Sequence, residues 1–157
     1  MAVALACSGC GFQLRDSAEL PPQMSRTQIL IDDEYSPLAR RLQDLLTQSG
    51  VRLVSGGDAS AVLEIPLNEV LTEVLTIGNN ARVREYRISH TVRFRLLDAT
   101  GQELMGWQTL RQQREISFDE QKILATSREQ EYVRQDLADT LSRLLLMRLE
   151  TAVRRPG

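Results

Sequence analysis

Residues 85–96 carry the strictest pattern in the sequence, and this pattern limits the folds that the chain can adopt. Every second position belongs to a largely apolar set, which consists of Tyr86, Ile88, His90, Val92, Phe94 and Leu96. The positions between them form a polar set, which consists of Glu85, Arg87, Ser89, Thr91, Arg93 and Arg95. A period of two places each set on its own face of a β-strand. The pattern therefore predicts a long strand of an antiparallel sheet with one buried face.

Two further long strands are predicted beside this segment. From residue 61, alternate positions place Ala61, Leu63, Ile65 and Leu67 on one buried face, and Pro66 indicates a sheet edge or a bulge. The pattern resumes over 74–77 and ends at a tight-turn sequence, residues 78–80. Residues 98–101 predict a second hairpin turn and 103–116 a return strand. Three consecutive strands joined by turns form a meander.

Helices are predicted before and after the meander. Ser36 is a suitable N-cap, Pro37 suits the first helical position, and leucines then recur on one face until Gly50 ends the helix. Residues 132–149 contain no proline or glycine and repeat apolar side chains at helical spacing. A short strand is expected over 28–31 and only an extended piece over 51–54. The order β-α-β-β-β-α predicts the α+β class, as a two-layer sandwich with an antiparallel or mixed four-stranded sheet and two helices on one face.

The two cysteines, Cys7 and Cys10, lie in a short apolar and small-residue stretch at the N-terminus. A redox CxxC would follow a strand and open a helix, and the six residues before Cys7 are too few for that strand. A zinc site would need about four ligands, and the chain has one distant histidine besides these cysteines. Small residues leading into a cysteine are instead typical of the end of a secretory signal. Gly9-Cys10 resembles the cleavage site of bacterial lipoproteins, and Ala6-Cys7 is a competing site.

The run Cys-Gly-Phe-Gln-Leu-Arg, residues 10–15, resembles the N-terminus of the LptE family of lipopolysaccharide-assembly lipoproteins. Weaker matches continue in order through residues 21–22, 29–32, 36–38 and 85–86. The resemblance implies the fold order predicted above. It also implies that residues 1–9 are the remnant of a signal peptide, that Cys10 carries lipid, that 10–27 form an extended arm, and that 28–157 form one domain. A lipidated cysteine holds a protein on a membrane without a spanning segment.

The same resemblance implies a function and partners. A protein of this family would form the plug of the outer-membrane β-barrel LptD, assist assembly of that barrel, and help deliver lipopolysaccharide to the outer leaflet. It would be anchored to the outer membrane and face the periplasm and the barrel lumen. Because hairpin tips project furthest, the residues expected to contact the barrel are Gly78, Asn79, Asn80, Thr100 and Gly101. The formal net charge of −2 provides no overall field for nucleic acid, so none is expected as a partner.

Arginine makes up 18 of the 19 basic residues, and several arginines fall near the central strand. The guanidinium group binds phosphate through two parallel hydrogen bonds. Lipopolysaccharide carries phosphates on lipid A, so the candidate ligand-binding residues are Arg82, Arg84, Arg87, Arg93 and Arg95. Coding bias, and a solvated sheet face with alternating charges, explain the same residues without a ligand.

Enzymatic chemistry is not expected. His90 is the sole histidine and falls on the apolar face of its strand, which favours a hydrogen-bonded core residue. The sequence contains none of the nucleophile-elbow, phosphate-loop, dinucleotide or zinc-protease motifs, so no catalytic residue, cofactor or metal is predicted. Two alternatives remain: a periplasmic lipoprotein that carries an anionic lipid or glycan without a barrel, and a weak hydrolase that uses His90.

Overall fold

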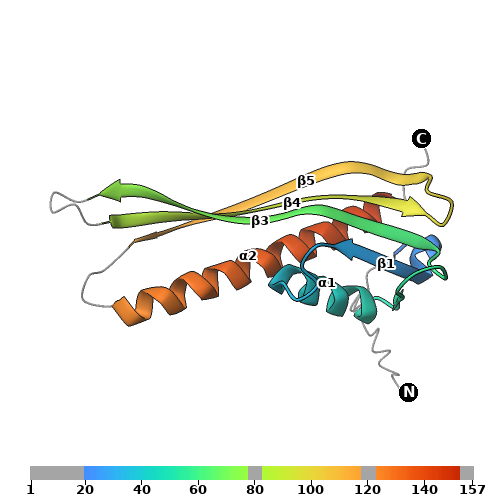
Figure 1. The fold of residues 1–157 in the computed structure, drawn as a ribbon, viewed down its shortest axis with the longest axis horizontal. Helices are drawn as coiled ribbons and strands as arrows, with labels where there is room; N and C mark the ends of the chain where they lie inside the picture. The colour runs from blue at the N-terminus through green and yellow to red at the C-terminus, as the bar shows by residue number, and fades with distance from the viewer. Residues whose placement is uncertain (1–19, 78–82, 118–122, 153–157) are drawn as a thin grey trace, which may run out of the picture.

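The computed structural model describes residues 20–77, 83–117 and 123–152, which form two layers (Figure 1). A five-stranded sheet makes one layer, and two helices that lie on the same face of the sheet make the other. The α+β class and the placement of both helices on one face are confirmed. The elements in chain order are η1 (Pro22–Ser25), β1 (Arg26–Ile31), α1 (Pro37–Gln48), β2 (Arg52–Leu53), β3 (Ala61–Ile77), β4 (Val83–Asp98), β5 (Glu103–Ser117) and α2 (Ile123–Ala152).

The sheet is mixed, with the strand order β2-β1-β3-β4-β5. β1 runs parallel to β2 and to β3, whereas β3, β4 and β5 form the expected antiparallel meander. The expected number of four strands was wrong, because Arg52 and Leu53 pair with Arg26 and Thr27 as a fifth. Two residues are too few to show a period of two, so this strand leaves no pattern in the sequence.

The main core lies between the helices and the half of the sheet next to β1. The predicted boundaries of α1 are confirmed: the Ser36 hydroxyl accepts a hydrogen bond from the backbone N–H of Ala39 at 3.3 Å, and Gly50 follows the helix at a φ of 84°. Leucines of both helices are fully buried against the sheet. The helix residues of this core are Leu38, Leu42, Leu46, Ala138, Leu141, Leu145 and Leu149.

The described start of the chain packs onto this core. β1 begins at Arg26, two residues before the expected strand, and the 3-10 turn η1 precedes it. Met24 and Thr27 are fully buried, and the Thr27 hydroxyl donates to the Met24 carbonyl at 2.8 Å. Residues 20–27 therefore belong to the domain and are not a free arm. Cys7 and Cys10 lie outside the described residues.

Pro66 marks a bulge in β3, as its sequence position indicated. The register passes from Glu64 opposite Arg95 to Leu67 opposite Arg93, so two residues of β3 stand opposite one of β4. A bulge moves every later side chain to the other face of the sheet. Leu67 is consequently 36% exposed, and the expectation that it shares the buried face of Leu63 and Ile65 was wrong.

Fewer helical residues cover the half of the sheet that lies away from β1. α1 does not reach it, and the first half of α2 lies opposite it at an angle (Figure 1). A small second cluster of Ile88, Ile116, Leu137 and Val133 joins α2 to the strands there. α2 begins at Ile123 and is therefore longer than the predicted helix over 132–149. Val70 and Val74 of β3 remain 40% and 49% exposed.

Candidate functional site

No described helix covers the face of the sheet opposite α1 and α2 (Figure 1). Arg87, Arg93 and Arg95 occupy alternate positions of the strand, as the sequence pattern predicted. Their neighbours on this face come from β3 and β5, the strands on either side. The arginines therefore do share one surface, which we call the outer sheet face.

Two of these arginines are held by carboxylates. The Arg95 Nε donates to Glu64 Oε2 at 2.6 Å, and its Nη1 donates to Glu103 Oε1 at 3.4 Å. The hydrogen bond that Arg95 donates to Glu64 raises the pKa of Arg95 above its ordinary value. Arg87 donates to Glu115 Oε1 from Nη2 at 2.7 Å and from Nε at 3.2 Å. The positive charge of both side chains is balanced by the neighbouring strands.

Trp107 of β5 joins Arg93 and Arg95. Each guanidinium carbon lies 4.5 Å from the centroid of the indole ring, within the range of a cation–π contact. Trp107 is on this face because it precedes Gln108, which pairs with the buried Phe94, and neighbouring residues of a strand point to opposite faces. Within the described ranges Arg93 has no ion-pair partner, so it is the arginine of this group most available to an anion. The sequence placed Trp107 on the return strand but gave it no role.

The predicted hairpin residues Thr100 and Gly101 form the turn between β4 and β5. The Asp98 Oδ1 atom accepts hydrogen bonds from the Thr100 hydroxyl at 2.7 Å, the Thr100 N–H at 2.8 Å and the Gln102 N–H at 2.9 Å. These bonds, that of the Thr100 hydroxyl first, lower the pKa of Asp98. Gly101 has a φ of 85°, which explains why glycine occupies this position. Hydrogen bonds among residues 98–102 therefore hold the turn in place.

The other predicted contact residues are not described in full. Gly78, Asn79, Asn80 and Arg82 fall outside the described residues, and for Arg84 only the backbone, in β4, is described. The 16 residues of β4 extend over about 50 Å, and the turn with Thr100 lies at the end of the sheet opposite to Ile77 (Figure 1).

A cavity of about 460 Å³ opens on the helix-facing side, where α1 begins. His90 lines it and is 2% exposed, which confirms the prediction of a core histidine. Burial lowers the pKa of His90 to about 4, so the ring is neutral at pH 7. Its Nε2 lies 2.7 Å from Asn68 Oδ1, and Asn68 Nδ2 donates to the Ser36 hydroxyl at 3.1 Å. Sequence reasoning missed Asn68, because the bulge at Pro66 turns it inward.

The cavity does not have the arrangement of a hydrolase. The Ser36 hydroxyl donates its hydrogen to the Asp33 carbonyl at 2.8 Å and is separated from His90 by Asn68. A base that activates a nucleophile must be within hydrogen-bond reach of it. Within the three described stretches, no three His, Cys, Asp or Glu side chains are grouped closely enough to hold a metal ion. Neither α1 nor α2, as far as they are described, is long and apolar enough to cross a membrane.

Residues 26–149 match the model of a protein family described as LptE, lipopolysaccharide-assembly. The chain is 25% identical over 150 residues to the LPS-assembly lipoprotein LptE of Photorhabdus laumondii, with 94% of this chain and 80% of the relative covered. It is 26% identical over 152 residues to the same lipoprotein of Pectobacterium atrosepticum, with the same coverage. The crystal structure of the rare lipoprotein B from Shewanella oneidensis has a similar fold, with a TM-score of 0.67, 24% identity, and 82% of this chain and 97% of that chain covered.

Proposed function

The chain belongs to the LptE family of lipopolysaccharide assembly, and from this membership we propose that it is the plug of an LptD-type β-barrel in the outer membrane. In this role it assists assembly of the barrel and delivery of lipopolysaccharide to the outer leaflet. The role is not enzymatic, and the family is described by an assembly process rather than by a reaction. The observation that carries the proposal is the family match over most of the domain.

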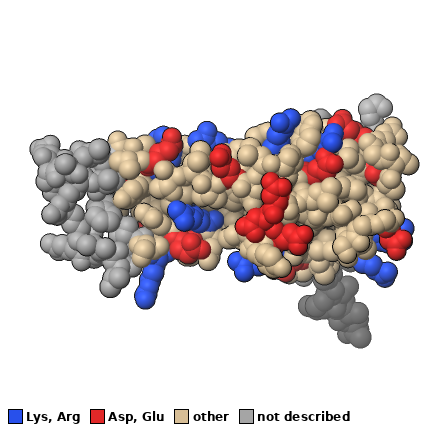
Figure 2. All heavy atoms as spheres, viewed as in Figure 1, with Lys and Arg blue, Asp and Glu red and all other residues tan. Residues whose placement is uncertain are grey.

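The outer sheet face supports a plug. The lumen wall of a large barrel is polar, so a domain inside it needs a surface with many polar groups of both signs. On the outer sheet face Glu64, Glu103 and Glu115 balance Arg95 and Arg87. Figure 2 shows basic and acidic side chains interspersed over another side of the molecule as well. A surface with both charges is more complementary to a lumen wall of mixed charge than to a partner that carries a strong charge of one sign.

Arg93 is the residue of this face that we propose as a phosphate contact. Its guanidinium lies against Trp107 and has no carboxylate partner among the described residues, so a phosphate would not have to displace one. Arg95 and Arg87 would each have to exchange a carboxylate for the phosphate. Arg82 and Arg84 stay candidates from the sequence. Lipid A phosphates are the proposed ligand groups, since guanidinium binds phosphate through two hydrogen bonds.

Membrane attachment is proposed through lipid on Cys10. Cleavage before this cysteine would remove residues 1–9, including Cys7, and leave a chain that reaches the packed segment at Leu20 after nine residues. Two or more acyl chains hold a protein far more firmly than a single chain. The tether would let the domain sit at the periplasmic end of a barrel.

Co-purification from detergent-solubilised outer membranes, with mass spectrometry of the N-terminal peptide, tests the proposal. A stoichiometric large β-barrel together with an acylated Cys10 would support the plug. An acylated protein that carries lipopolysaccharide without any barrel would instead favour the alternative, a barrel-independent carrier of an anionic lipid or glycan. An unmodified N-terminus, with neither a barrel nor lipopolysaccharide co-purifying, would refute both the plug and the barrel-independent carrier.

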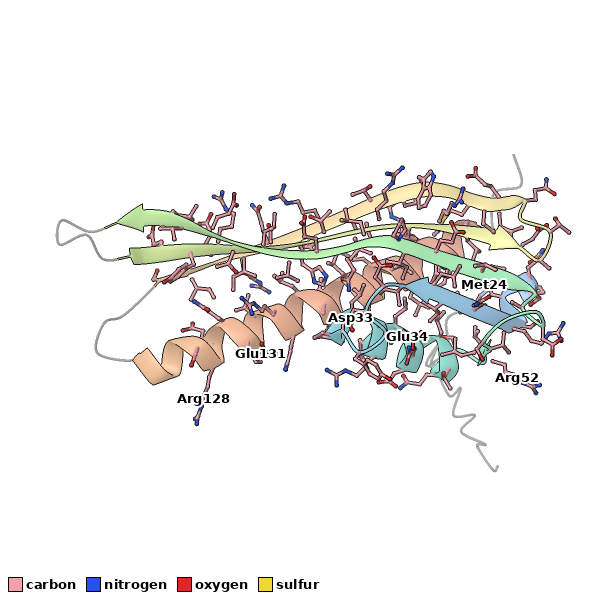
Figure 3. All side chains as sticks on the ribbon, viewed as in Figure 1. Met24, Asp33, Glu34, Arg52, Arg128 and Glu131 are labelled. Atoms are coloured by element: carbon pink, nitrogen blue, oxygen red, sulfur yellow. The ribbon has the colours of Figure 1, made fainter. Side chains whose placement is uncertain are left out.

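Charge reversal tests the phosphate contact. We expect Arg93→Glu to weaken lipopolysaccharide binding about tenfold, because a charge-assisted hydrogen bond contributes about 1.5–3 kcal/mol. Arg128→Glu is the matched control, since Arg128 is exposed on α2 and points away from the sheet (Figure 3). The melting temperatures of both variants should stay near that of the parent. Equal binding by the two variants would remove Arg93 from the site.

A further inference from the structure

The cavity beside His90 has no role in the proposed plug, yet its polar side chains are arranged as in a binding site. We propose that it binds a neutral, hydroxyl-bearing group of the saccharide class, with a ligand hydroxyl donating to His90 Nδ1. The walls come from five parts of the fold, which are the loop before α1, the first turn of α1, β3, β4 and α2. The lining residues are Asp33, Ser36, Pro37, Leu38, Asn68, Val70, His90, Glu131, Arg134 and Ala138.

A chain of hydrogen bonds fixes the tautomer of His90. Ser36 donates its only hydroxyl hydrogen to the Asp33 carbonyl, so its oxygen accepts from the Asn68 amide nitrogen. The Asn68 oxygen therefore faces His90 at 2.7 Å, and His90 Nε2 carries the hydrogen that it accepts. The other ring nitrogen, Nδ1, is left as an acceptor with a lone pair.

The Nδ1 atom of His90 has no hydrogen-bond partner among the described residues. The atom is also buried. A buried polar atom without a partner costs free energy, which a ligand that supplies a donor recovers. Val70 stands directly opposite His90 in the sheet and is 40% exposed. Val70 and His90 line the same cavity, and the proposal requires that a ligand donor reach Nδ1 from there.

The charges at the cavity select the class of ligand. Asp33 and Glu131 contribute two carboxylates, and Arg134 contributes one guanidinium, so the formal sum is one negative charge. Figure 3 labels both carboxylates, Asp33 on the loop before α1 and Glu131 on α2, and Figure 2 shows acidic atoms gathered near the middle of the face drawn. This balance disfavours a phosphate and favours a ligand with several hydroxyl donors and some acceptors for Arg134.

The remaining lining suits a saccharide. Pro37 and Val70, which are exposed, supply apolar contact for the C–H groups of a sugar ring. A volume of about 460 Å³ is within the usual range for small-ligand sites, about 300–1,000 Å³. Arg134 Nη2 has only a 3.4 Å contact to the Thr72 hydroxyl among its described interactions, so it can turn toward a ligand.

The source of the saccharide is the only part of this inference that rests on the proposed function. If the protein handles lipopolysaccharide, the sugar portion of that molecule can enter the cavity while its phosphates lie on the outer sheet face. A free sugar has the same chemistry. The two sources are distinguished by the probes below.

The single histidine makes the test specific, because every imidazole ¹⁵N signal of the full chain belongs to His90. The purified protein is titrated with maltose, with the deacylated oligosaccharide of lipopolysaccharide, and with inorganic phosphate. We expect a saturable shift of the Nδ1 resonance toward lower frequency with a saccharide, as the nitrogen accepts a hydrogen bond. Glu131→Gln should weaken that binding several-fold, whereas Arg128→Gln, which removes a charge of α2 outside the cavity, should leave it unchanged.

Each outcome of the titration either supports or overturns the saccharide site. A shift with the oligosaccharide but not with maltose supports the site and assigns lipopolysaccharide as its source, and the reverse supports a free sugar. No shift at concentrations that would saturate a millimolar site overturns the inference, and so does a shift with phosphate alone. If intact lipopolysaccharide binds in an Arg93-dependent manner while the His90 signals stay unchanged, the proposed function stands and the saccharide site fails.

Discussion

Lowering the pH should destabilise this protein through His90 well before its carboxylates protonate. The side chain has an ordinary pKa of 6.5 and a pKa of about 4 in the fold, because burial penalises the charged ring. Between these values the unfolded chain binds a proton that the folded chain does not. Stability is therefore complete above about pH 6.5 and is lost as the pH falls toward 4. Asp33 and Glu131 favour the charged ring and Arg134 opposes it, but burial is the cause that dominates.

The size of the loss follows from the two pKa values. At about 1.4 kcal/mol per pH unit, the full difference between 6.5 and about 4 is worth about 3 kcal/mol. Between pH 7 and pH 5 the free energy of unfolding should fall by about 2 kcal/mol. With a urea m-value of about 2 kcal/mol/M, the midpoint of unfolding would drop by about 1 M.

Urea unfolding at pH 7, 6 and 5 measures this loss, with His90→Met as the control. The variant has no histidine left, so its midpoint should change with pH by much less than that of the parent. Asp98, whose pKa is lowered by its turn, loses its contribution only below its ordinary value of 3.8 and does not interfere. Equal pH dependence of parent and variant would refute the argument that burial holds His90 neutral.

Two predictions concern the packing of the sheet. Leu141→Ala removes a fully buried side chain of the main core and should cost about 2–5 kcal/mol in urea unfolding, whereas a loss below about 1 kcal/mol would show that α2 is packed differently. Glu64→Gln removes the charge of a half-buried partner of Arg95 on the outer sheet face and should change stability by about 1 kcal/mol or less, since water still screens the pair and Glu103 remains beside Arg95. A larger loss in thermal unfolding would mean that this pair is part of the structural core.

Long periodic segments made the fold predictable from the sequence. β4 carries alternation over residues 85–96, and α1 has both a capping serine and a terminating glycine, so each was placed correctly. The two-residue strand β2 was missed because nothing in its sequence repeats. The start of α2 was placed too late, since none of the side chains of residues 127–131 is buried and no apolar stripe marks this part of the helix.

The candidate sites were less predictable, because their contacts join residues far apart in the chain. Glu64 and Arg95 are 31 positions apart, and Asn68 and His90 are 22 apart. Strand alternation gives the face of each residue, but the register between strands decides which residues meet. The sequence identified Arg93 and Arg95 as neighbours on one face. It could not show that Trp107 lies against both, since that contact depends on how β5 is aligned with β4.

The bulge at Pro66 connects the two candidate sites physically. Without the extra residue, Leu67 would continue the buried row of β3 and Asn68 would face the outer side of the sheet. With it, Leu67 stands beside Arg93 on the outer sheet face, and Asn68 faces inward, where it binds His90 and Ser36. Bulges are common where a strand must redirect a side chain for function. One inserted residue thus ends the main core and sets the tautomer of His90, and it also places an apolar neighbour beside the arginine proposed to bind phosphate.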